Sequence, residues 1–140
     1  MTERVILDTG PLVAFFDPGD EAHEWAVDTF RRLRTPLLTN EAVLVEGVYL
    51  LRYSQASQDR ILEWVTRGTL SLAFDLGTEV ALVRRLMRKY RDVPMSLADA
   101  CLVRMAEMFD GHAVCTLDRD FRVYRKNGEA PVPLIAPEDP

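Results

Sequence analysis

The chain has few of the residues that build zinc and redox sites: 2 cysteines and 2 histidines among 140 residues. Cys101 and Cys115 lie on different predicted elements, without CxxC spacing and without a histidine pair nearby, which argues against a zinc site. We expect both thiols to be small core residues. His23 falls in a predicted amphipathic helix and His112 at the start of a predicted strand, so structural or surface roles are expected for both.

Long apolar runs are missing as well. Runs such as 42–45 and 48–51 are far shorter than the ~18 residues that a membrane-spanning helix needs. The opening MTERVILD enters strand-like sequence directly, without the basic and apolar segments of a secretory signal. We therefore expect a cytoplasmic protein that does not associate with membranes. With 48% hydrophobic residues, the chain is long enough for one compact domain, predicted to span residues 1–140.

Positive charge is limited, and lysine is scarce among the 17 basic residues. The net charge of −5 argues against a protein that coats duplex nucleic acid, because neutralising phosphates requires a basic surface. The arginines gather at 31–34, 84–91 and 119–125, each time on a predicted helix or at its end. Each cluster is either a solvated helix face or a set of phosphate contacts. The candidates for phosphate contact are Arg84, Arg88 and Arg119.

Strand and helix patterns alternate along the whole chain. The predicted strands are 4–8, 37–39, 70–74, 112–116 and an edge strand at 133–136. The predicted helices begin at Pro11 and then cover 20–34, 40–53, 57–66, 78–91 and 96–109, with a helical turn at 118–126. This alternation predicts an α/β fold in which helices cover both faces of a mostly parallel sheet. In such sheets a ligand lies outside the carboxyl ends of the strands.

Acidic residues stand at that predicted edge. Asp8 directly follows the apolar strand VIL, and Asp118 follows HAVCTL. Glu46 and Asp99 lie on helices, and the residues three and four positions away from each are mostly apolar. We therefore expect both to lie on buried helix faces, where an unpaired carboxylate would be costly.

Each acid also has a structural interpretation. Asp8 and Asp118 could cap the helical turns that follow them. Asp99 stands three residues after Ser96, which fits a capping box. Glu46 could reach solvent from the edge of its helix face. A fifth acid, Asp120, could orient a turn or pair with a neighbouring arginine, and the sequence leaves open whether it is also a ligand.

Taken together, the four acids predict a metal site. Two carboxylates about 4 Å apart repel by about 4 kcal/mol at an effective dielectric constant of ~20, so a cation is expected among them. Oxygen ligands without a histidine cluster favour Mg²⁺ or Mn²⁺ over Zn²⁺, and such a site suits the cleavage of phosphodiester bonds. The hydroxyls of Thr9, Ser96 and Thr116 lie close in sequence and could hold metal-bound waters or phosphate oxygens.

The segments that carry these acids resemble the PIN domain, and in particular the bacterial VapC-type toxins. They are VILDTG, VLVEGVYLL, PMSLADACLVRMAE and VCTLDRDF, in the order and at the spacing usual for the family. The resemblance covers essentially the whole chain and includes the four acidic positions. One departure is that Gly10 and Pro11 replace the serine and alanine-type residues often found after the first aspartate, which leaves Thr9 as the hydroxyl there.

The resemblance implies a Rossmann-like three-layer fold and a ribonuclease that uses Mg²⁺ or Mn²⁺ to cut single-stranded RNA. It implies that Asp8, Glu46, Asp99 and Asp118 form the catalytic and metal-binding quartet, accompanied by Thr116. It also implies a homodimer and a small antitoxin whose tail enters the active-site groove. The arginine candidates then become possible RNA contacts.

Two other classes of protein fit the sequence less well. A haloacid-dehalogenase-like phosphatase needs a second acid two residues after the first, but position 10 is glycine. A receiver domain needs a lysine at the end of a late strand, and Lys89 and Lys126 are both misplaced. Two alternatives stay open: a PIN-like module that binds RNA or a partner without cutting, and a free-standing PIN nuclease without an antitoxin.

Overall fold

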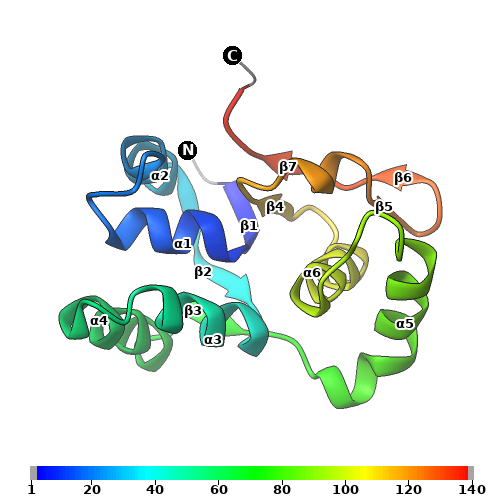
Figure 1. Cartoon of the computed structure of the whole chain (residues 1–140), viewed down its shortest axis with the longest axis horizontal. Helices are drawn as coiled ribbons and strands as arrows, with labels where there is room; N and C mark the ends of the chain where they lie inside the picture. The colour runs from blue at the N-terminus through cyan, green and yellow to red at the C-terminus, as the bar shows by residue number, and fades with distance from the viewer. Residues whose placement is uncertain (1–2, 139–140) are drawn as a thin grey trace.

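The computed structural model describes residues 3–138, in which a five-stranded parallel sheet lies between two groups of helices (Figure 1). The strands of this sheet are β1 (Glu3–Leu7), β2 (Leu33–Thr39), β3 (Leu70–Leu72), β4 (Ala113–Cys115) and β7 (Leu134–Ile135). The helices are α1 (Thr9–Phe16), α2 (His23–Phe30), α3 (Glu41–Leu50), α4 (Gln55–Thr66), α5 (Leu76–Lys89), α6 (Leu97–Met108) and the 3₁₀ helix η1 (Arg119–Arg122). A separate antiparallel hairpin consists of β5 (Arg125–Lys126) and β6 (Ala130–Pro131). The predicted three-layer α/β architecture, including the edge strand near the C-terminus, is confirmed.

The strand order β3-β2-β1-β4-β7 changes direction at β1. The chain first moves outward from β1 to β2 and β3, and then returns to the other side of β1 to form β4. Right-handed crossovers therefore place α1 to α4 on one face of the sheet and α5 and α6 on the other, in agreement with Figure 1. The reversal creates a switch point between the carboxyl ends of β1 and β4, where open α/β sheets bind their ligands.

The centre of the core is β1, which pairs with β2 on one side and β4 on the other. Its last three residues, Val5, Ile6 and Leu7, are each 0% exposed. A continuous apolar run is what a parallel strand covered on both faces requires. The run ends at the carboxyl edge of the sheet, and the next residue is Asp8.

The predicted helix at 20–34 is too long. In the structure α2 ends at Phe30, and the chain enters β2 at Leu33. Leu33 and Arg34 are paired with Glu3 and Arg4 of β1. Pairing with β1, which is distant in sequence, determines where the helix ends. The helical periodicity of residues 20–34 gave no sign of this pairing.

Three helices begin earlier than predicted, the first of them α1, which begins at Thr9 rather than Pro11 because Asp8 is its N-cap residue. The helix predicted at 57–66 begins at Gln55 as α4, because the side chain of Ser54 caps it by accepting the Ser57 backbone N–H at 3.2 Å. Similarly, α5 begins at Leu76 rather than Thr78, since Asp75 is its N-cap residue. Because several residues in each segment can cap a helix, sequence alone selected the wrong one.

The predicted helical turn at 118–126 is only partly correct. The 3₁₀ helix η1 accounts for its first part, but the chain then forms the β5–β6 hairpin. The turn contains Asn127 and Gly128, with φ values of 53° and 88°. Asn-Gly is a strong hairpin signal because both residues tolerate positive φ, and the sequence interpretation overlooked it.

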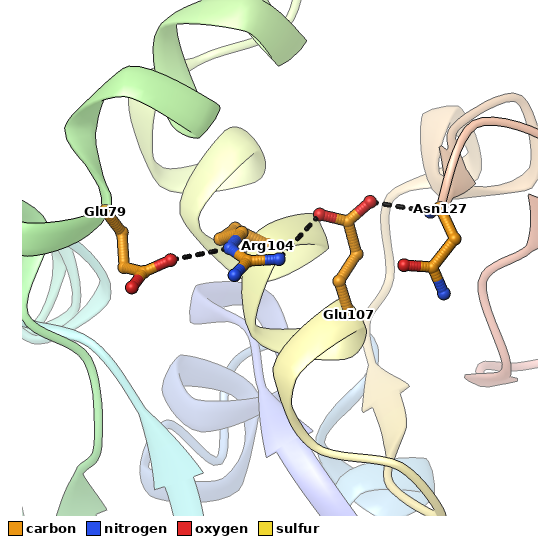
Figure 2. Close-up of polar contacts among 4 residues, drawn as sticks. All are labelled: Glu79, Arg104, Glu107 and Asn127. Carbon is orange, nitrogen blue, oxygen red and sulfur yellow. Dashed lines mark hydrogen bonds and ion pairs between the residues drawn. The ribbon is translucent and has the colours of Figure 1, made fainter.

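A polar network connects α5, α6 and this hairpin (Figure 2). Arg104 of α6 donates from Nε to Glu79 of α5 at 2.6 Å and from an Nη atom to Glu107 at 3.2 Å. The second oxygen of Glu107 accepts the backbone N–H of Asn127 at 2.6 Å. Burial acts to lower the pKa of Arg104, but the hydrogen bonds that Arg104 donates to both glutamates, and the charges of these glutamates, raise it above its ordinary value. The network therefore fixes the helices that carry part of the candidate site.

The structural roles predicted for both cysteines are confirmed. Cys101 and Cys115 are free and buried, and burial raises the pKa of the two thiols to about 11 and about 12. Such thiols stay protonated at neutral pH and act as small apolar groups. Among residues 3–138, no helix combines the length and the apolar composition required to cross a membrane.

Candidate active site

Asp8 lies at the switch point, immediately after β1. Its Oδ1 accepts the backbone N–H of Thr9 at 2.7 Å, and its Oδ2 accepts the hydroxyl of Thr116 at 2.7 Å. The register of the sheet explains the second contact: Leu7 pairs with Cys115, so the residues that follow them lie side by side. Asp8 is therefore both the N-cap of α1 and a carboxylate fixed on two sides.

The carboxyl group of Asp8 is difficult to ionise. The residue is only 8% exposed, and this burial raises the pKa of Asp8 from its ordinary value of 3.8 to about 6. Hydrogen bonds from Thr116 and Thr9 lower the pKa, while the charges of Asp99 and Asp118 raise it further. Negative charge therefore accumulates at this edge of the sheet, which is the condition that a bound cation would relieve.

Asp118 is connected to Asp8 through Thr116. The Thr116 hydroxyl oxygen accepts the backbone N–H of Asp118 at 2.9 Å. The same hydroxyl donates a hydrogen bond to Asp8 Oδ2. Asp118 in turn caps η1, since its Oδ1 accepts the backbone N–H of Asp120 at 2.9 Å. One fully buried hydroxyl thus fixes the positions of two acids, and the role of the Asp120 side chain stays a prediction.

Asp99 approaches from the first turn of α6. It forms the predicted capping box with Ser96, in which each residue's side chain accepts the other's backbone N–H. The hydroxyl of Tyr124 also donates to Asp99 Oδ2 at 3.3 Å. Burial raises the pKa of Asp99, the hydrogen bonds from Ser96 and Tyr124 lower it, and the charge of Asp118 raises it. Asp8, Asp99 and Asp118 therefore each form capping hydrogen bonds and each lie near another acid of the site.

The expected burial of Glu46 is wrong. Its side chain is exposed, because α3 turns Val43 and Gly47 toward the core instead. Leu12 of α1 lies 3.3 Å from the position that a Cβ on Gly47 would occupy, so this close approach of helices sets which face of α3 is buried. Within the described residues, the charges that raise the pKa of Asp8 and Asp99 do not include Glu46. Its assignment as a ligand stays a prediction.

Comparison with known proteins agrees with this geometry. The family model described as PIN domain matches residues 5–127. The chain belongs to the PIN domain family. It is also similar to a protein named Ribonuclease VapC26 from Mycobacterium tuberculosis (strain ATCC 25618 / H37Rv), with 27% identity over 117 residues that cover 82% of this chain and 87% of the relative. The resemblance to PIN domains of the VapC type, drawn from the acidic segments, is thereby confirmed.

The donor set of this PIN domain fits a hard divalent cation in its chemistry. The side chains at the switch point offer carboxylate and hydroxyl oxygens, which Mg²⁺ and Mn²⁺ prefer. The buried hydroxyl of Thr9, next to Asp8, has no hydrogen-bond partner in residues 3–138, so it is an orphaned polar atom beside the site.

The tight four-carboxylate cluster expected from the sequence is not formed. Within the described part of the chain, no three acidic, histidine or cysteine side chains lie close enough together to hold one ion. Each aspartate is instead held by its own capping hydrogen bonds. One or two carboxylates suffice for Mg²⁺, which keeps several of its waters and also binds substrate phosphates.

From the sequence, one residue at the site, Tyr124, was missed, and the role of another, Arg119, was predicted only in part. Tyr124, which touches Asp99, was not recognised, since no spacing rule connects it to an acid on another element. Arg119, a predicted phosphate contact, lines a pocket of about 300 Å³ together with Asp118 and Arg122. Arg84 and Arg88 are exposed on α5, which packs against the helix that carries Asp99.

Proposed function

We propose that this PIN domain is an Mg²⁺- or Mn²⁺-dependent endoribonuclease and the toxin of a VapBC-type toxin–antitoxin pair. The observation that carries the proposal is the pair Asp8 and Asp118, joined through the buried hydroxyl of Thr116 at the switch point of the sheet. The similarity to Ribonuclease VapC26 supports RNA as the substrate. An antitoxin partner is supported by the same relationship.

In this proposal Asp8, Asp99, Asp118 and Glu46 of α3 together form the metal site, in which one or two carboxylates would bind the ion directly and the others through its waters. When bound, the ion polarises a phosphate oxygen and lowers the pKa of a water molecule. Thr116 keeps Asp8 and Asp118 in a fixed relation, and Ser96 fixes Asp99. Thr9 is proposed as a further supporting hydroxyl, since its buried oxygen next to Asp8 has no hydrogen-bond partner in residues 3–138. Arg119, beside Asp118 in the pocket, is suited to a neighbouring phosphate.

The experiment that tests the proposal is cleavage of single-stranded RNA by the purified protein. We expect cleavage with Mg²⁺ or Mn²⁺, none with a chelator, and recovery when the metal is restored. Single-stranded DNA of the same sequence is the control substrate. Metal binding and RNA binding without cleavage would instead support the non-cutting PIN-like module. Co-purification with a small protein that blocks cleavage would separate a toxin from a free-standing nuclease.

A homodimer is part of the proposal, and the surface formed by α3 and the turn that follows it supports it. Val45, Tyr49 and Tyr53 follow one another at intervals of four residues and are 70%, 59% and 86% exposed. Arg52 stacks over both tyrosine rings, at 4.2 and 4.5 Å from their centroids. Exposed apolar stripes of this kind mark protein contact surfaces.

Replacing Arg84 and Arg88 together with glutamine is expected to weaken RNA binding and to flatten its salt dependence. For a single strand, removing one arginine–phosphate ion pair reduces the slope of log K against log salt by about 0.7. Binding of a non-cleavable RNA at several salt concentrations measures this slope. The matched control replaces Arg31 and Arg67, which removes the same charge from residues that pair with Asp28 and Glu63 on other helices. Equal slopes for both double variants would assign the α5 cluster to a solvated face.

A further inference from the structure

Tyr124 is a large polar side chain buried at the edge of the site. The residue is 0% exposed, yet its hydroxyl reaches Asp99 Oδ2 at 3.3 Å. A buried tyrosine hydroxyl needs a hydrogen-bond partner, and this one donates to a carboxylate that carries a proposed ligand role. The backbone N–H of Ser96 donates to the same Oδ2 atom at 3.2 Å. Two donors from different segments therefore fix the orientation of the Asp99 carboxylate.

The ring of Tyr124 is held firmly from both sides. Phe121 and Tyr90 each pack edge-to-face against it, with ring centroids 5.1 Å away. Its backbone N–H donates to the carbonyl of Asp120 at 3.3 Å, which anchors it to the 3₁₀ helix that Asp118 caps. Tyr124 therefore connects the segment of Asp118 to the side chain of Asp99 on α6.

We propose that Tyr124 is a positioning residue that sets the Asp99 carboxylate relative to Asp118 for metal binding. This inference rests on the proposed function, because it assigns Tyr124 a role toward a metal ligand of the same site. Groups that hydrogen-bond to metal-binding carboxylates orient them, and losing such a group weakens metal affinity by about 10- to 100-fold. In this proposal Tyr124 makes no contact with the ion and affects metal binding only through its hydrogen bond to Asp99.

The chain offers a matched control in the same aromatic cluster. Tyr90 is 7% exposed, and its hydroxyl accepts the backbone N–H of Arg125 at 2.8 Å. Tyr90→Phe and Tyr124→Phe each remove one buried hydroxyl and keep the ring packing. Only the hydroxyl of Tyr124 contacts an acid of the site. A general loss of packing or stability should therefore affect both variants, whereas a positioning role affects one.

The test is the affinity of wild type, Tyr124→Phe and Tyr90→Phe for Mn²⁺, measured by calorimetry with the full chain and no RNA. We expect Tyr124→Phe to bind Mn²⁺ about 10-fold more weakly than wild type, and Tyr90→Phe to stay within about 2-fold. Thermal melts show how far each variant is destabilised. If Tyr124→Phe melts too close to the titration temperature, all three proteins are titrated with trimethylamine N-oxide, which favours the compact state.

A second readout uses excess metal. If Tyr124 acts by positioning a ligand, RNA cleavage by Tyr124→Phe should recover toward the wild-type rate as Mn²⁺ is raised above its new dissociation constant. Equal Mn²⁺ affinity in Tyr124→Phe and Tyr90→Phe would overturn the positioning role while leaving the proposed function standing. Absence of Mn²⁺ binding and metal-dependent cleavage in the wild type would overturn the proposed function itself.

Discussion

Asp8→Asn is expected to abolish RNA cleavage while making the folded protein more stable at neutral pH. Removing a direct metal ligand should cost more than the 10- to 100-fold typical of groups that only orient a ligand, so we expect cleavage to fall by well over about 100-fold. Stability should rise because Asp8 is 8% exposed and its ionised form lies near Asp99 and Asp118. The amide oxygen of the new asparagine can still accept the N–H of Thr9, and the substitution removes the negative charge of Asp8.

The sign of the stability effect depends on pH. Burial raises the pKa of Asp8 in the folded state to about 6, above its ordinary value of 3.8. The folded state therefore binds this proton more tightly than the unfolded state, and the stability this contributes is present below about pH 4 and is lost as the pH rises through 6. The full difference corresponds to about 3 kcal/mol. We expect Asp8→Asn to gain about 1–3 kcal/mol at pH 7.5 and almost nothing at pH 4.

Urea unfolding of both proteins at the two pH values, in the presence of a chelator, measures this gain. Asp28→Asn is the control, because Asp28 is exposed and pairs with Arg31 at the surface. It should leave cleavage unchanged and alter stability by less than about 0.5 kcal/mol. Retained cleavage in Asp8→Asn would contradict the site assignment. A stability gain that is equal at pH 4 and pH 7.5 would contradict the electrostatic explanation.

Arg104→Met is expected to cause the largest loss of stability among these variants. The Arg104 side chain is only 21% exposed, and its partners Glu79 and Glu107 are 16% and 12% exposed. Removing the arginine leaves two poorly solvated carboxylates facing each other without their shared cation (Figure 2). Breaking a buried pair costs about 3–5 kcal/mol, and partial exposure reduces this here to about 2–3 kcal/mol, measured by urea unfolding.

Two further variants separate the effect of charge pairing from that of packing. Arg31→Met breaks a pair whose side chains are 74% and 68% exposed, so its effect should be below about 0.5 kcal/mol. Adding Glu79→Gln and Glu107→Gln to Arg104→Met should recover part of the loss, because the uncompensated charges are then removed. No recovery in the triple variant would mean that Arg104 acts mainly through the packing of its aliphatic stem.

Local signals predicted the capping contacts of the aspartates correctly. The capping box of Ser96 and Asp99 and the cap role of Asp8 both depend on residues within one helical turn of each other in the sequence. The position of Asp8 directly after an apolar strand was enough to predict its place at the ligand-binding edge. Glu46 was misplaced because apolar neighbours do not reveal which face of a helix packs inward. That choice depends on the close approach of Gly47 to Leu12 of α1.

By itself, the sequence determined the alternation of strands and helices, the parallel sheet, and the acids at its carboxyl edge, because periodicity and capping act over a few residues. Only the tertiary structure decided that β1 and β4 are neighbours, that one threonine hydroxyl joins Asp8 to Asp118, and that Tyr124 reaches Asp99. It also decided which hydrogen bonds hold each of the three aspartates and that Glu46 stays exposed. These contacts join residues far apart in the chain, and they form only when the strand order and the helix packing bring the residues together.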